Sequence, residues 1–168
     1  MIAAGLFNIG LSATNEMEFC TSCHSMKINL EEYKETIHYT SPSGVRATCS
    51  DCHVPKEFVP KMVAKVIAAK DVWHEMIGTI DTREKYEQHR WDMANRVWEK
   101  MKATDSRECR TCHAFEQMDL GEQGRSARKR HSKAIDKGQT CIDCHKGIAH
   151  ELPDEPEEEE EEAEDGNA

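Results

Sequence analysis

The sequence predicts a mainly α-helical protein with many loops and little or no β-sheet. Apolar residues recur at three- and four-residue spacing after Pro60 and after Asp81, which is the helical period. No run with a two-residue period is long enough to predict a strand. Only 38% of the 168 residues are hydrophobic and 32% are charged, so side chains alone would make a small core.

Four helices are expected, over residues 29–39, 60–77, 81–102 and within 123–137. Asn29 and Glu32 have the spacing of a capping box, and so do Asp81 and Glu84. Gly138 suits the residue after the end of the last helix.

Charge is concentrated at the C-terminal end. Residues 151–168 contain 11 of the 32 acidic residues and no Lys or Arg, which leaves 21 acids against 22 bases in residues 1–150. We therefore predict a disordered acidic tail over residues 154–168, either a solubilising segment or an arm for a basic partner. The near-neutral body argues against nucleic-acid binding.

The first residues are mostly apolar. Residues 1–13 are shorter than the roughly 20 residues that a membrane-spanning helix needs, and they lack the basic start of a signal peptide. We expect this stretch to be the remnant of an N-terminal membrane anchor, truncated or missing in this chain.

All eight cysteines fall in four copies of the pattern C-x-x-C-H. A disulfide scaffold gives no reason for a histidine after every second cysteine. Zinc ribbons pair their C-x-x-C motifs about 15–20 residues apart, and these motifs are spaced more widely. The pattern is that of covalent c-type haem attachment. The cysteines are Cys20, Cys23, Cys49, Cys52, Cys109, Cys112, Cys141 and Cys144.

The spacing suits this chemistry because two thiols two residues apart can bond the two vinyl groups of one porphyrin. The following histidine then lies under the iron. Four haems would also supply apolar surface that the side chains lack. Covalent haem attachment occurs outside the bacterial cytoplasm, so we expect a periplasmic location.

The motifs divide the chain into two di-haem halves around a helical insert. We expect a tetrahaem domain over residues 14–153, with haems 1 and 2 in residues 14–80, the insert over residues 56–104 and haems 3 and 4 in residues 105–153.

The remaining histidines are candidates for second axial ligands, together with the methionines. His150 follows the motif residue His145 so closely that it would reach a neighbouring haem more easily than its own. The candidates outside the motifs are His38, His74, His89, His131 and His150.

Several longer words around the motifs carry a family resemblance. They include E-F-C-T-S-C-H-S-M, T-I-H-Y, G-V-R-A-T-C-S-D-C-H-V-P-K, G-T-I-D-T-R-E-K, D-S-R-E-C-R-T-C-H and C-I-D-C-H-K-G-I-A-H. With them, residues 14–153 strongly resemble the NapC/NirT/NrfH family of membrane-anchored tetrahaem cytochromes, and the NapC/NirT branch most closely. The resemblance implies electron transfer from membrane quinol to a periplasmic reductase, usually nitrate reductase.

The resemblance also implies ligand roles. Met26 would ligate haem 1 in place of His24, beside an open or water-filled position with Asp81 nearby. The other pairs would be His53 with His74 at haem 2, His113 with His150 at haem 3, and His145 with His131 at haem 4. His38 would be a ligand or a quinol-site residue, and His89 has no assigned role.

Asp81 has two interpretations. It could cap the second long helix, or it could accept a proton near haem 1, because quinol oxidation releases protons that haem does not take. Lys27 and Arg46 are weaker candidates for the same pocket.

Three functions are therefore expected in order. The first is a quinol dehydrogenase-type electron-transfer subunit whose partners are the membrane quinol pool and a periplasmic reductase. The second is a soluble periplasmic carrier, and the third is a small-molecule reductase with an open haem 1. We expect the first at the periplasmic face of the bacterial inner membrane, with a homo-oligomer as a further expectation.

Overall fold

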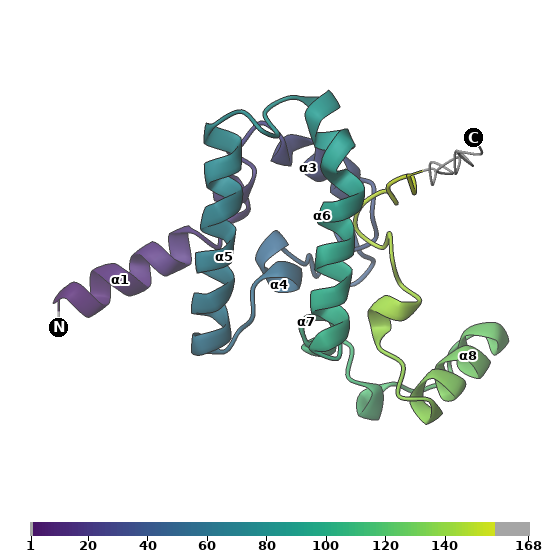
Figure 1. Ribbon diagram of the computed structural model, residues 1–168. Coiled ribbons are helices and arrows are strands. Elements are labelled where there is room, and N and C mark those ends of the chain that lie inside the picture. The colour runs from purple at the N-terminus through teal and green to yellow at the C-terminus, as the bar shows by residue number, and fades with distance from the viewer. Residues whose placement is uncertain (1, 157–168) are drawn as a thin grey trace, which may run out of the picture.

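In the computed structural model, which describes residues 2–156, the longest elements are two helices joined by a short turn. They are α5 (Phe58–Met76) and α6 (Arg83–Ala103). The helices form two columns that run in opposite directions, with α4 (Cys49–His53) between them (Figure 1). This pair is the helical insert expected from the sequence.

The other elements are short. Residues 2–156 contain no strand, so the expected mainly α class is confirmed. The remaining elements are α1 (Ile2–Ala13), α2 (Met17–Cys20), α3 (Met26–Lys34), α7 (Arg107–Arg110), α8 (Arg125–Asp136) and the 3-10 turns η1 (Phe115–Gln117) and η2 (Cys141–Asp143).

The starts of two helices differ from the sequence expectation. Helix α6 begins at Arg83 because Thr82 is its cap, with Oγ1 accepting a hydrogen bond from Lys85 N at 3.3 Å. The expectation that Asp81 caps this helix is therefore wrong. Its carboxylate pairs instead with the Lys85 ammonium.

Helix α3 begins at Met26, earlier than expected. The Asn29–Glu32 capping box does not form, because both side chains bind α6 instead. Asn29 Oδ1 accepts a hydrogen bond from the Tyr86 hydroxyl at 2.7 Å, and Glu32 pairs with Arg90 at 2.7 Å. At the other end of the chain, Gly138 follows α8 with φ +61, as expected for a residue that ends a helix.

The side-chain core is small. The buried hydrophobic residues are scattered over several elements and include Ile28, Tyr33, Ala64, Ile80, Tyr86 and Ile142. The apolar stripe of α5 is exposed instead, with Val66 72% and Met76 74% accessible. Side chains alone therefore do not close a core of ordinary size among the described residues.

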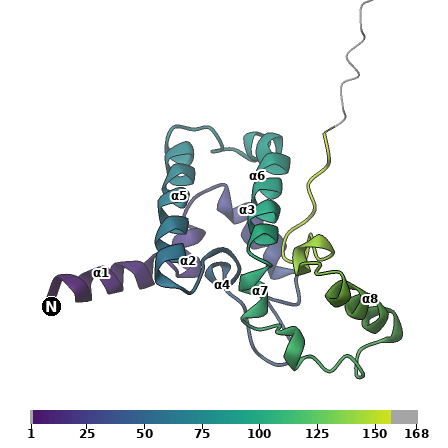
Figure 2. The same cartoon turned by 60° about the horizontal axis from the view of Figure 1, so that its bottom comes forward.

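Helix α1 extends away from the rest of the molecule, and α8 lies at the opposite side (Figures 1 and 2). The inner end of α1 is fixed by Lys65 of α5, whose Nζ donates to the Thr14 carbonyl at 2.8 Å. Within residues 2–156, every helix is too short or too polar to cross a bilayer. Most of the predicted acidic tail, from residue 157 on, lies outside the described residues.

Candidate haem site

The four C-x-x-C-H motifs lie in series. Helix α2, which ends in the first motif, contacts α4 of the second, and α4 contacts α7 of the third (Figure 2). The thiols of Cys20 and Cys49 are hydrogen-bonded, which lowers the pKa of Cys20 to about 7. In the fourth motif, Ile142 N donates to the Ser106 hydroxyl at 3.1 Å, just before the third motif. Each motif therefore neighbours the next one in sequence.

The second and fourth motifs share one local geometry. In each, an aspartate two residues after the first cysteine accepts hydrogen bonds from the threonine before that cysteine. Thr48 N donates to Asp51 Oδ2 at 2.8 Å, and Thr140 N donates to Asp143 Oδ2 at 2.8 Å. Both motifs are capping boxes that fix the turn carrying the two thiols.

The first and third motifs use a hydroxyl at the same position, with the hydrogen bond reversed. Ser22 Oγ donates to the Phe19 carbonyl at 2.7 Å, and Thr111 Oγ1 donates to the Glu108 carbonyl at 2.7 Å. The four motifs thus alternate between two designs, which agrees with a chain built from two similar halves.

A lysine reinforces each aspartate. Lys56 pairs with Asp51, and Lys102 pairs with Asp143 at 2.8 Å. Hydrogen bonds from Lys102 and then Thr140 lower the pKa of Asp143 to about 2. Burial raises the pKa of Asp51, but hydrogen bonds from Lys56 and Thr48 outweigh it and hold that pKa below its ordinary value.

Three motif histidines each face a histidine from outside the motifs. The ring centres lie 6.2 Å apart for His53 and His150, 6.2 Å for His38 and His113, and 6.0 Å for His131 and His145. A metal ion takes histidine nitrogens at roughly 2 Å, so two rings that share one ion have centres about 6 Å apart. The three spacings fit one axially ligated iron per pair.

Burial supports the same interpretation. The Nδ1 atoms of His38 and His150 are buried without a hydrogen-bond partner, which is costly unless something else binds the ring. His53 retains exposed surface although it lies deep among neighbouring atoms, and desolvation there lowers the pKa of His53 to about 4. Burial also lowers the pKa of His38 and His150. These rings are held in the neutral form that binds a metal.

Comparison with known proteins agrees with this geometry. A sequence model described as the NapC/NirT cytochrome c family, N-terminal region, matches residues 1–155. The chain belongs to this family. Its four motifs accordingly attach covalent haem c.

Several family members are similar over most of their length. A tetraheme cytochrome-c type protein of Allochromatium vinosum is 63% identical over 90% of this chain and 82% of its own. Cytochrome c-type protein NapC of Escherichia coli K12 is 54% identical, covering 89% and 76%. Denitrification system component NirT of Stutzerimonas stutzeri is 55% identical, covering 89% and 75%.

One solved structure has the same fold. It is the crystal structure of a cytochrome c nitrite reductase NrfHA complex bound to the HQNO inhibitor. Its matched chain has a TM-score of 0.51 and 22% identity, covering 92% of both chains.

For this NapC/NirT family member, the facing histidines differ from two of the pairs expected from the sequence. His150, not His74, faces His53, because the segment after His150 is hydrogen-bonded to α3 and α6. His38 takes the place expected for His150 opposite His113.

The other two histidines lie apart from these pairs. His74 lies at the end of α5, where its Nδ1 is 3.3 Å from Thr79 Oγ1. His89, on α6, is exposed. On α8, His131 faces His145 as expected.

Sequence reasoning missed the position of His38. This histidine lies in a loop fixed by Tyr33, whose hydroxyl donates to the His38 carbonyl at 2.9 Å and also contacts the Ala47 carbonyl. Burial raises the pKa of Tyr33 to about 12, so the hydroxyl keeps its proton. The only signal in the sequence was that His38 belongs to the word T-I-H-Y.

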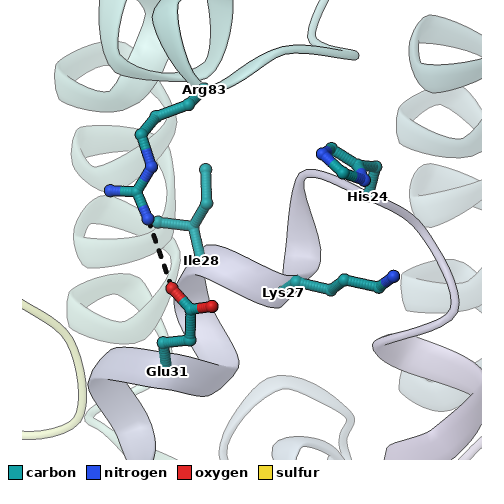
Figure 3. A pocket seen from close by; sticks show the side chains of 5 residues that line it. All are labelled: His24, Lys27, Ile28, Glu31 and Arg83. Carbon is teal, nitrogen blue, oxygen red and sulfur yellow. Dashed lines mark hydrogen bonds and ion pairs between the residues drawn. The ribbon is translucent and has the colours of Figure 1, made fainter.

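The first motif has different surroundings. His24 is exposed, and its backbone N–H donates to Glu75 Oε1 at 2.9 Å. Beside it lies a pocket of about 250 Å³, in which Arg83 pairs with Glu31 at 3.2 Å (Figure 3). The lining residues are His24, Lys27, Ile28, Glu31 and Arg83. The expectation that Lys27 lines a pocket at this motif agrees with its place here.

Asp81 lies on the turn between α5 and α6. Its Oδ1 accepts a hydrogen bond from Lys85 Nζ at 2.7 Å, and this bond, with a smaller contribution from His24, holds the pKa of Asp81 below its ordinary value. Gly78 is required at this turn: its φ is +76, and a Cβ there would lie 3.2 Å from Asp81 Oδ2. Asp81 is thus fixed electrostatically near the first motif.

Two other candidates lie outside the pocket lining. Met26 begins α3, where Asn29 Nδ2 lies 3.8 Å from its sulfur. Arg46 lies 3.9 Å over the ring of Tyr39 and donates to the Tyr39 carbonyl.

Proposed function

We propose that this NapC/NirT family member is a quinol-linked electron-transfer protein at the periplasmic face of the bacterial inner membrane. Electrons would pass along its four haems to a periplasmic reductase, with a nitrate reductase as the acceptor. The proposal rests on one observation above all: the four attachment motifs lie in contact, in sequence order, with a differently built motif at one end. When bound, the haems accept and release single electrons.

The facing histidines suggest which side chains hold each iron. We assign His53 and His150 to haem 2, His113 and His38 to haem 3, and His145 and His131 to haem 4.

The first haem retains His24 and Met26 as alternative ligands from the first motif region. Since His74 is next to Glu75, which binds the backbone of the first motif, it would serve this haem if it serves any.

The first motif is the proposed entry site for electrons. The pocket beside His24 combines the Arg83 and Glu31 charges, which can bind and orient the hydroxyls of a quinol headgroup. Quinol oxidation also releases two protons, which need acceptors close by. We propose that the Asp81 carboxylate takes one of them, and that the Lys85 ammonium keeps this carboxylate ionised and ready.

The test is reduction of the haem-loaded protein by a quinol analogue in lipid vesicles, followed by haem absorbance. Asp81→Asn should slow reduction at least several-fold while the haem content stays at four. Asp92→Asn, an exposed change on α6, is the matched control. Failure of the unmodified protein to be reduced would contradict the quinol proposal, and equal rates for Asp81→Asn would remove only the role of Asp81.

A second candidate function is reduction of a small anion at an open haem 1. Lys27 and Arg83 place two cations around the pocket beside His24, which would attract such a substrate (Figure 3). A ferric spectrum with four low-spin haems would argue against this candidate, because every iron would then already have two axial ligands.

A further inference from the structure

The peptide of Glu151 is held at both of its polar groups. Its N–H donates to Glu32 Oε2 at 3.0 Å, and its carbonyl accepts from Arg90 Nη2 at 2.9 Å. Glu32 belongs to α3 and Arg90 to α6, so two separate helices hold the residue that directly follows His150. We call Glu32 and Arg90 the clamp.

The clamp is itself an ion pair with little access to water. Arg90 Nη2 lies 2.7 Å from Glu32 Oε2, and the two side chains are only 9% and 11% exposed. Glu87 binds the other guanidinium nitrogen at 3.3 Å, so Arg90 has little freedom to move. Placing two charges out of water is expensive, and a buried ion pair is weak evidence for a stabilising role. A more specific purpose is therefore worth seeking.

A second ion pair shows that joining these helices does not need buried charges. Glu31 and Arg83 also link α3 to α6, at 3.2 Å, yet their side chains are 68% and 59% exposed. What distinguishes the clamp from this pair is its hydrogen bonds to the Glu151 backbone.

His150 has no secondary structure of its own to fix it. It lies in an irregular segment, whereas His131, which faces His145, is carried by α8. His38, the other facing histidine in an irregular segment, is anchored through its carbonyl by the Tyr33 hydroxyl. In both irregular segments a side chain from a helix binds the backbone at or next to the facing histidine.

We propose that Glu32 and Arg90 are positioning residues that hold the His150 ring opposite His53, as the second axial ligand of haem 2. This inference rests on the ligand assignment made under the proposed function. Without the clamp, the segment after His150 would lose both anchors, and His150 would leave its position part of the time. Haem 2 would then bind external ligands.

The experiment measures carbon monoxide binding by the reduced, haem-loaded protein, with haem content checked by mass. Iron with two histidine ligands has no free position, so displacement of His150 adds a carbon monoxide-binding haem. Glu32→Ala and Arg90→Met should each gain up to one such haem per chain over the unmodified protein. Added imidazole should reverse the gain, and Arg90→Lys, which keeps a charge and a donor, should show a smaller one.

Matched controls separate positioning from general loss of stability. Glu31→Ala and Arg83→Met break the exposed pair between the same helices and should gain nothing. His150→Ala removes the ring itself and should gain one full haem. Where Glu32→Ala lowers the haem content, Glu32→Gln replaces it, with a smaller gain of the same kind expected.

Two results would overturn the inference, and they differ. If His150→Ala gains a haem but Glu32→Ala and Arg90→Met behave like the controls, the clamp does not position His150. If His150→Ala itself gains nothing, the assignment of His150 to haem 2 fails, and the role of the clamp fails with it. Neither result bears on whether quinol reduces the protein.

Discussion

His53 and His150 face each other with ring centres 6.2 Å apart, although His53 ends the second attachment motif and His150 follows the fourth. His38 and His113 cross between the two halves of the sequence in the opposite direction. The two halves therefore exchange histidines, and neither half contains all the rings that face its own motifs.

His38→Ala should open haem 3. If His38 shares an iron with His113, the variant should keep four haems and gain one that binds carbon monoxide when reduced. His89→Ala, an exposed change on α6, should leave the spectrum unchanged. An unchanged spectrum for His38→Ala would mean that another residue ligates haem 3.

The same measurement on His74→Ala separates two ligand sets. The family resemblance pairs His74 with His53, whereas the structure places His150 there. We expect His74→Ala to leave haem 2 with both of its ligands.

Ser106→Ala should destabilise the junction between the third and fourth motifs. Ser106 is fully buried, has φ +49, and its hydroxyl accepts from Ile142 N at 3.1 Å. Loss of the hydroxyl leaves a buried N–H without an acceptor, which costs about 1–3 kcal/mol. Denaturant unfolding of the haem-loaded protein measures the change, with the exposed Ser132→Ala as the control. Equal stability of the two variants would contradict this account.

Asp143→Asn should change how stability depends on acid. The folded pKa of Asp143 is lowered to about 2, so its contribution is fully present above its ordinary value of 3.8 and is lost as the pH falls toward 2. Melting temperatures measured from pH 2 to 7 should therefore differ between the variant and the unmodified protein near neutrality and converge at the acid end. Asp136→Asn, on the exposed side of α8, should follow the unmodified protein throughout.

The chain without haem should not fold cooperatively. Few hydrophobic side chains are buried among residues 2–156, and large apolar ones on α5 are exposed. Expression without haem attachment should give a colourless chain whose circular dichroism shows some helix but no sharp thermal transition. A sharp transition in that chain would show that side chains alone form an adequate core.

Local features of this protein could be predicted from the sequence, and long-range ones could not. The C-x-x-C-H motifs follow from covalent chemistry within five residues, and the long helices follow from apolar periodicity. The caps of α3 and α6 were wrong because Asn29 and Asp81 have partners outside the local pattern. The facing of His38 and His113 depends on a loop fixed by Tyr33, which no spacing rule contains.

The position of His150 also has a consequence for biogenesis. All eight attachment cysteines precede residue 145, and proteins are synthesised and exported with the amino end first. With His150 as its ligand, the second centre is completed only after the last motif has emerged. A product truncated just before residue 150 would carry every covalent link yet leave one iron accessible to peroxide or other small oxidants. Intact delivery of the far end is thus a condition for a chemically quiet cytochrome.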